Sequence, residues 1–95
     1  MPWQGSEQFD YDLESILMFA PMKSGVFATF ARGTWVYIGE SGNICGQLLA
    51  RLGDDYVCSA QQRPTHFACE LVAAASRSAR QSQLVQEFQP VNNAG

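Results

Sequence analysis

The stretch Gly25-Val-Phe-Ala-Thr-Phe-Ala-Arg-Gly-Thr-Trp-Val-Tyr-Ile-Gly39 decides the architecture that the sequence predicts. It contains two runs rich in β-branched and aromatic residues, 25–31 and 34–39, with Arg32-Gly33 between them. Glycine tolerates the positive φ of a tight turn, and the flanking composition is typical of strands. We therefore expect residues 25–31 and 34–39 to pair as antiparallel strands.

The segments that follow this hairpin alternate between helical and strand patterns. A polar loop that can cap a helix, residues 40–43, precedes apolar residues at helical spacing, and Gly53-Asp54-Asp55 offers an end to that helix. Alternating apolar and polar residues then predict a strand, and a final apolar stripe capped by Ser76 predicts a helix before Pro90. The expected elements are a helix over 44–52, a strand over 65–73 and a helix over 76–88.

The first 23 residues have a different character. Leu13, Ile16 and Leu17 recur at helical spacing, and Pro21 ends the pattern, so a short helix is expected there. No internal repeat or long linker divides the rest of the chain. The sequence thus predicts an α+β protein with an N-terminal helical appendage at 1–23 and one domain at 24–95. In that domain, helices flank a small antiparallel three-stranded sheet.

Composition narrows the class of protein. The chain has 95 residues, of which 46% are hydrophobic and 16% charged, as in compact globular domains. No apolar run approaches the ~20 residues that cross a bilayer, and the N-terminus lacks the pattern of an export signal. We expect a cytoplasmic protein that makes no membrane contact. Cys45, Cys58 and Cys69 form no CxxC pair and are odd in number, which predicts neither a zinc module nor a disulfide scaffold.

Charge limits any contact with nucleic acid. The net charge is −3, with only six lysines and arginines. Small nucleic-acid binders usually carry a basic excess, because affinity rests largely on neutralised phosphates. DNA or RNA is therefore expected to bind only weakly.

Gly25-Val26-Phe27 and Tyr37-Ile38-Gly39, nine residues apart, resemble the paired signature of the GIY-YIG endonuclease superfamily. The resemblance extends over residues 24–93. The order of elements agrees, Gly42-Asn43-Ile44 resembles the opening of the family's first helix, and Leu84-Val85 with Pro90 and Asn93 resembles its closing motif. The nearest pattern is the nuclease domain of the bacterial excision-repair incision proteins.

The resemblance implies a site at which most of the chemistry has changed. In the family a tyrosine helps to activate water, a helix arginine stabilises the phosphate and a later glutamate holds a divalent metal. The positions that match these roles carry Phe27, Gln47 and Gln81. Phenylalanine has no hydroxyl, and a neutral amide neither offsets phosphate charge nor anchors Mg²⁺ well. Tyr37 keeps its phenol, and Arg51 lies one helical turn after Gln47.

Three interpretations follow. The first is a catalytically impaired GIY-YIG-like domain that needs no cofactor and binds nucleic acid or a protein, with Tyr37, Gln47, Arg51, Gln81 and Asn93 as candidate binding residues. The second is a divergent Mg²⁺-dependent DNA endonuclease with Tyr37 and Arg51 as catalytic residues and Glu40 as a metal ligand. The third is an unrelated small α+β interaction protein in which the motif is a coincidence.

Overall fold

A computed structural model describes residues 8–31, 34–58 and 64–90, with the side chains of residues 54–58 left aside. Its sheet has four strands in the order β1-β4-β2-β3, and every neighbouring pair is antiparallel. The elements in chain order are β1 (Phe9–Asp10), α1 (Leu13–Phe19), β2 (Gly25–Ala31), β3 (Thr34–Ser41), α2 (Ile44–Cys58), β4 (His66–Leu71), a single 3₁₀ turn η1 (Ala74–Ser76) and α3 (Arg77–Phe88).

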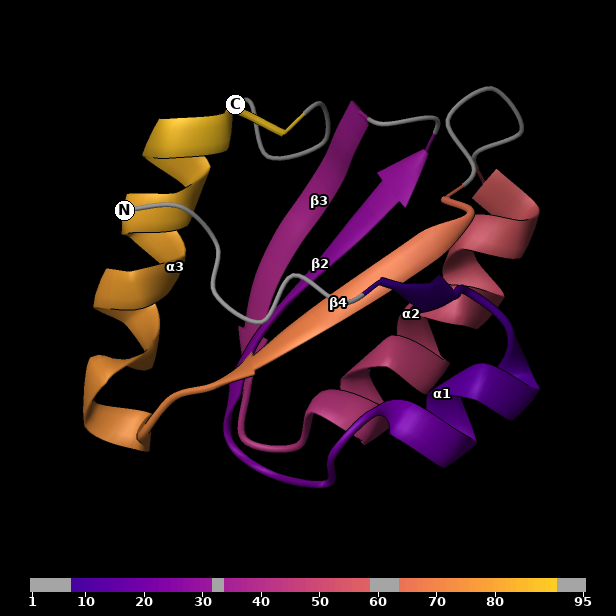
Figure 1. Ribbon diagram of the computed structural model, residues 1–95, viewed down its shortest axis with the longest axis horizontal. Helices are drawn as coiled ribbons and strands as arrows, with labels where there is room; N and C mark the ends of the chain where they lie inside the picture. Colours follow the sequence, from indigo (N-terminus) through magenta and orange to yellow (C-terminus); the bar gives the residue numbers. More distant parts are fainter. Residues whose placement is uncertain (1–7, 32–33, 59–63, 91–95) are drawn as a thin grey trace.

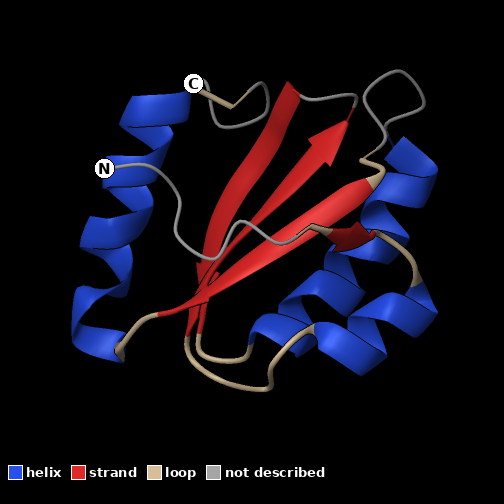
Figure 2. Cartoon of the chain, in the orientation of Figure 1, coloured by secondary structure: helices blue, strands red, loops and turns tan. Residues whose placement is uncertain are grey.

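Helices cover both faces of this sheet, with α1 and α2 on one side and α3 on the other (Figure 1). The central strand β2 is buried along most of its length and sends alternate side chains to the two faces. Phe27 joins the buried cluster under α1 and α2, whereas Val26 and Ala28 join the cluster under α3. The strands seen in red between the helices in Figure 2 therefore separate two halves of one core.

The glycines of the two tripeptides are required by close packing. Phe27 lies opposite Gly39 in the register of β2 and β3. A Cβ on Gly39 would lie 2.5 Å from Cζ of Phe27 and 2.6 Å from Cε2 of Tyr37, and a Cβ on Gly25 would collide with the carbonyl oxygen of Glu70. Close packing of β2 against β3 and β4 thus explains both glycines of the Gly-x-Phe and Tyr-x-Gly pattern.

The predicted α+β class and the antiparallel hairpin are confirmed. The strand count differs from the expected three, because the N-terminal segment supplies β1, which pairs with Phe67 and His66 of β4. A strand of two residues has no periodicity for a sequence pattern to reveal. The same segment contributes Tyr11, Ile16 and Ala20 to the buried cluster under α1 and α2. The division at residue 23 remains a prediction.

One expected helix end was wrong, and one expected capping residue makes no side-chain bond. The second helix continues beyond Gly53 to Cys58, because an interior glycine costs a helix only ~1 kcal/mol and the helix is held to the core through Leu48, Leu49 and Leu52. Ser76 does precede α3, but its side chain makes no capping hydrogen bond. Asp12 and Asn43, in contrast, accept bonds from the backbone amides of Ser15 and Gly46.

No helix among the described residues has the length and apolarity to cross a membrane.

Candidate functional site

Tyr37 and Arg51 form the centre of the candidate site. Tyr37 lies on β3 with its ring on the side covered by α2, and the guanidinium carbon of Arg51 lies 3.7 Å from the centroid of that ring. The contact has cation–π geometry. Phe27 lies behind Tyr37, with the ring centroids 6.0 Å apart, and is 1% exposed. The arrangement places a cation on an aromatic platform at an edge strand of the sheet.

Gln81 meets the same part of β3 from the other face of the sheet. Its side-chain amide donates a hydrogen bond of 3.1 Å to the carbonyl oxygen of Ile38, the residue after Tyr37. Gln47 is exposed on α2 one helical turn before Arg51. We call Phe27, Tyr37, Gln47, Arg51 and Gln81 the β3 site. Asn93, the remaining residue in the predicted binding set, lies outside the described residues.

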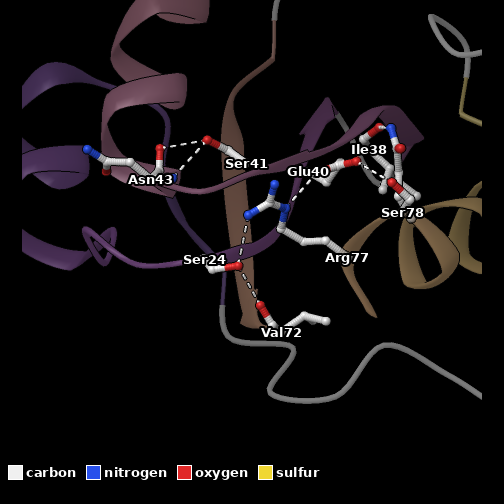
Figure 3. A network of polar contacts seen from close by, with 9 residues as sticks. Ser24, Ile38, Glu40, Ser41, Asn43, Val72, Arg77 and Ser78 are labelled. Atoms are coloured by element: carbon white, nitrogen blue, oxygen red, sulfur yellow. Dashed lines mark hydrogen bonds and ion pairs between the residues drawn. The ribbon is translucent and has the colours of Figure 1, made fainter. Parts of the chain in front are cut away.

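Glu40 lies on the opposite face of β3 from Tyr37 and Arg51, the face that α3 covers and from which Gln81 bonds to the strand. It is three positions after Tyr37, so the alternation of the strand directs the two side chains to opposite faces. One carboxylate oxygen accepts a 2.7 Å bond from Nε of Arg77, and the other accepts a 2.8 Å bond from Oγ of Ser78 (Figure 3). The Ser78 hydroxyl and the Arg77 guanidinium lower the pKa of Glu40 below its usual value. Glu40 therefore joins the end of β3 to the start of α3.

The same network reaches two further segments. Nη1 of Arg77 donates a 3.1 Å bond to Oγ of Ser24, and that hydroxyl donates a 2.7 Å bond to the carbonyl oxygen of Val72 (Figure 3). Arg77 thus connects the loop before β2, the end of β3 and the chain after β4. These are contacts that stabilise the fold.

The donor set of the β3 site does not fit a divalent cation. Mg²⁺ is usually held through carboxylates, whose charge offsets dehydration of the ion. The β3 site offers a phenol, a guanidinium and two neutral amides, and the amide nitrogen of Gln81 is already bonded to Ile38. Within the described ranges, no three His, Cys, Asp or Glu side chains gather closely enough to hold a metal. A role of Glu40 as a metal ligand would require it to exchange both of its present partners.

A second ion pair was missed by the sequence analysis. Arg80 on α3 binds both oxygens of Glu70 on β4, at 2.8 and 2.9 Å, with 14% and 19% of the two side chains exposed. The pair borders an open hollow of about 650 Å³ between β4 and α3. Glu70 and Arg80 are ten positions apart in the sequence and lie on different elements, so helical spacing does not predict their contact. Consequently Arg77 and Arg80 are each matched by a carboxylate.

Comparisons with known proteins identify the fold. No protein family model matches the sequence, and a search of curated proteins gave no match. Among solved structures, the chain resembles a tyrosine-to-phenylalanine point mutant of the GIY-YIG N-terminal endonuclease domain of UvrC from Thermotoga maritima, bound to the catalytic divalent cation. The TM-score is 0.67 and the identity 18%, over 88% of this chain and 100% of that one. The same domain bound to magnesium matches with a TM-score of 0.63 and 17% identity, over 84% of this chain and 97% of that one. The chain therefore has the GIY-YIG nuclease fold.

Proposed function

We propose that this chain is a binding module built on the GIY-YIG fold, which has lost phosphodiester cleavage and contacts nucleic acid weakly through the β3 site. The observation that carries the proposal is the contact of Arg51 with Tyr37, 3.7 Å from guanidinium carbon to ring centroid, with the ring of Phe27 behind Tyr37. A cation and an aromatic ring suit phosphate and base contacts. The site lacks the groups that would complete a hydrolytic reaction.

Loss of catalysis is supported at three positions of the β3 site. Phe27 has no hydroxyl to accept or donate a proton, and Cζ of its ring is packed against Gly39. Gln47 carries no charge with which to stabilise a phosphorane. Gln81 is a neutral amide engaged with a strand carbonyl. Phe27 thus acts as a packing group and Gln81 as a hydrogen-bonding group.

Weak binding follows from the supply of positive charge. The chain carries six lysines and arginines and a net charge of −3. Arg77 and Arg80 are paired with Glu40 and Glu70, which reduces their ability to neutralise phosphate. We assign Arg51, which lies over the ring of Tyr37, as the principal cation of the proposed interface. We expect a dissociation constant of about 10⁻⁵ M or weaker at physiological salt, with a salt dependence corresponding to about two or three phosphates.

The proposal is tested by cleavage and binding measurements on the same protein. Plasmid, branched and single-stranded DNA should remain intact in Mg²⁺ or Mn²⁺. Titration of labelled DNA and RNA at two salt concentrations should detect binding that strengthens as salt is lowered. Arg51→Ala should reduce the salt slope by about one unit, and Arg51→Lys, the matched control that keeps the charge, should preserve it.

Three results would change the conclusion. Metal-dependent cleavage that Tyr37→Phe or Glu40→Gln abolishes would replace the proposal with the divergent endonuclease. Nucleic-acid binding unaffected by Arg51→Ala would place the contact elsewhere on the molecule. No binding even at low salt would leave a protein as the partner, since an apolar interface depends little on ionic strength.

A further inference from the structure

The outer surface of α1 is unusually apolar. Of its five exposed positions, only Glu14 is polar. Six large apolar side chains of the described residues are exposed, and five of them lie between residues 13 and 22; their exposed fractions are 57% for Leu13, 61% for Leu17, 66% for Met18, 48% for Phe19 and 78% for Met22. A surface helix normally turns one apolar stripe to the core and polar residues to water. In α1 the core-facing position is Ile16, which is fully buried.

The exposed apolar group is large for a chain of this size. We call Leu13, Leu17, Met18, Phe19 and Met22 the α1 patch. With ~200 Å² for a fully exposed side chain of this kind, the patch offers roughly 600 Å². The largest apolar patch on a typical monomer is ~300–600 Å², and larger ones mark interaction sites. A standard interface buries ~800 Å² on each partner, so the patch and the polar residues around it are together large enough to form one.

The charges around the patch are arranged for self-association. Glu14 lies near the start of α1, and Lys23 lies four residues after its end; both are exposed. Lys23 follows the C-terminal end of α1, so antiparallel packing of two copies brings the end of each that carries Glu14 toward the end of the other that carries Lys23. An isologous contact therefore forms the same ion pair twice and covers both patches. We propose that the α1 patch is the interface of a homodimer.

The surroundings of the patch do not suit a lipid surface. Helices that lie on membranes carry several lysines or arginines on their polar face. The polar residues in and beside α1 are Asp12, Glu14, Ser15 and Lys23, and the whole chain has a net charge of −3. Anionic headgroups would be repelled. The mixed charges at the two ends match a copy of the chain itself.

The first test is the mass of the full chain in solution. Sedimentation equilibrium from 1 to 200 µM should give a mass approaching twice the 10.5 kDa of one chain. Leu17→Glu and Met18→Lys should each raise the dimer dissociation constant at least thirtyfold, because a charge in the centre of the interface has no partner. Gln86→Glu is the matched control: Gln86 is exposed on α3, which covers the other face of the sheet (Figure 1), and its substitution should leave the dimer unchanged.

The second test probes the orientation of the two helices. At low salt, Glu14→Lys or Lys23→Glu alone should raise the dissociation constant up to about tenfold, whereas the double exchange should restore it. Circular dichroism should confirm that each variant is folded. A monomer at 200 µM, a dimer insensitive to both Leu17→Glu and Met18→Lys, or a double exchange that restores nothing would each overturn the proposal. So would a monomer that instead co-sediments with phosphatidylcholine vesicles.

Discussion

Substitution of Gly39 by alanine tests the packing that holds the Tyr-x-Gly strand against its neighbour. The added Cβ would lie 2.5 Å and 2.9 Å from Cζ and Cε1 of Phe27, and 2.6 Å from Cε2 of Tyr37. Carbon atoms that are not bonded to one another sit ~3.5–4.0 Å apart, so the rings must move by about 1 Å. Phe27 is 1% exposed and cannot swing into water. The strain therefore falls on the core under α1 and α2.

The expected cost is large relative to the stability of a domain this small. Overpacking a core typically costs 1–3 kcal/mol, and contact with two rings places Gly39→Ala near the upper end, at ~2–3 kcal/mol. With a urea slope of about 1–1.5 kcal/mol per molar, the midpoint of unfolding falls by about 2 M. The thermal midpoint falls by about 10–15 °C.

Two further variants isolate the cause. Gly53→Ala is the matched control, since nothing lies within 4 Å of the added Cβ and Gly53 is inside α2; it should stabilise the protein by ~0.5–1 kcal/mol. Phe27→Leu removes the ring atoms that the new Cβ would meet, and alone it costs about 1 kcal/mol. Combined with Gly39→Ala it should cost at least 1 kcal/mol less than the two single changes added together.

The stabilities of the parent, the three single variants and the double variant are measured by urea and thermal unfolding, followed by circular dichroism. A Gly39→Ala variant within 0.5 kcal/mol of the parent would refute the packing argument. Additive costs for Gly39→Ala and Phe27→Leu would show that the strain arises somewhere other than the Phe27 ring.

Three other expectations follow from individual side chains. Hydrogen bonds from Ser78 and Arg77 lower the pKa of Glu40. The stability that these bonds contribute is present above the unfolded pKa of Glu40 and is lost as pH falls through its folded pKa. Urea titrations should show that Glu40→Gln is less stable than the parent at pH 6 and that its stability declines less between pH 6 and pH 3. Burial raises the pKa of the Cys69 thiol to about 12. In a variant that lacks the other two cysteines, a thiol reagent at pH 8 should therefore label Cys69 only when the protein unfolds. Rapid labelling of the folded protein would contradict this expectation. Gln81→Leu should cost ~1 kcal/mol by removing the hydrogen bond to the β3 carbonyl. Gln81→Glu should lower stability relative to the parent more at pH 7 than at pH 4, because an ionised carboxylate faces that oxygen; an equal difference from the parent at both pH values would exclude the contact.

Much of the β3 site was accessible from the sequence. Helical periodicity predicted that Arg51 lies one turn from Gln47. The short turn accounts for the pairing of Ala31 with Thr34, but a register shift between Thr29 and Phe30 places Phe27 opposite Gly39, and the sequence pattern did not predict that shift. The neutral chemistry of Gln81 was evident from the sequence, whereas its bond to Ile38 became known only from the structure. The separation of Glu40 from Tyr37 also follows from strand alternation, because three residues along a strand lead to the opposite face.

The sequence by itself determined the α+β class, the antiparallel hairpin and the absence of charge at the matched family positions, because these depend on local periodicity and on residue chemistry. Only the tertiary structure decided which charges meet. Glu40 lies 37 residues from Arg77, and Glu70 is 10 residues from Arg80, across different elements. The tertiary structure also decided that Arg51 covers the ring of Tyr37 and that α1 leaves Leu17 and Met18 exposed. Such contacts depend on how helices dock on the sheet, and that docking is set by packing throughout the core, where no short stretch of sequence carries the information.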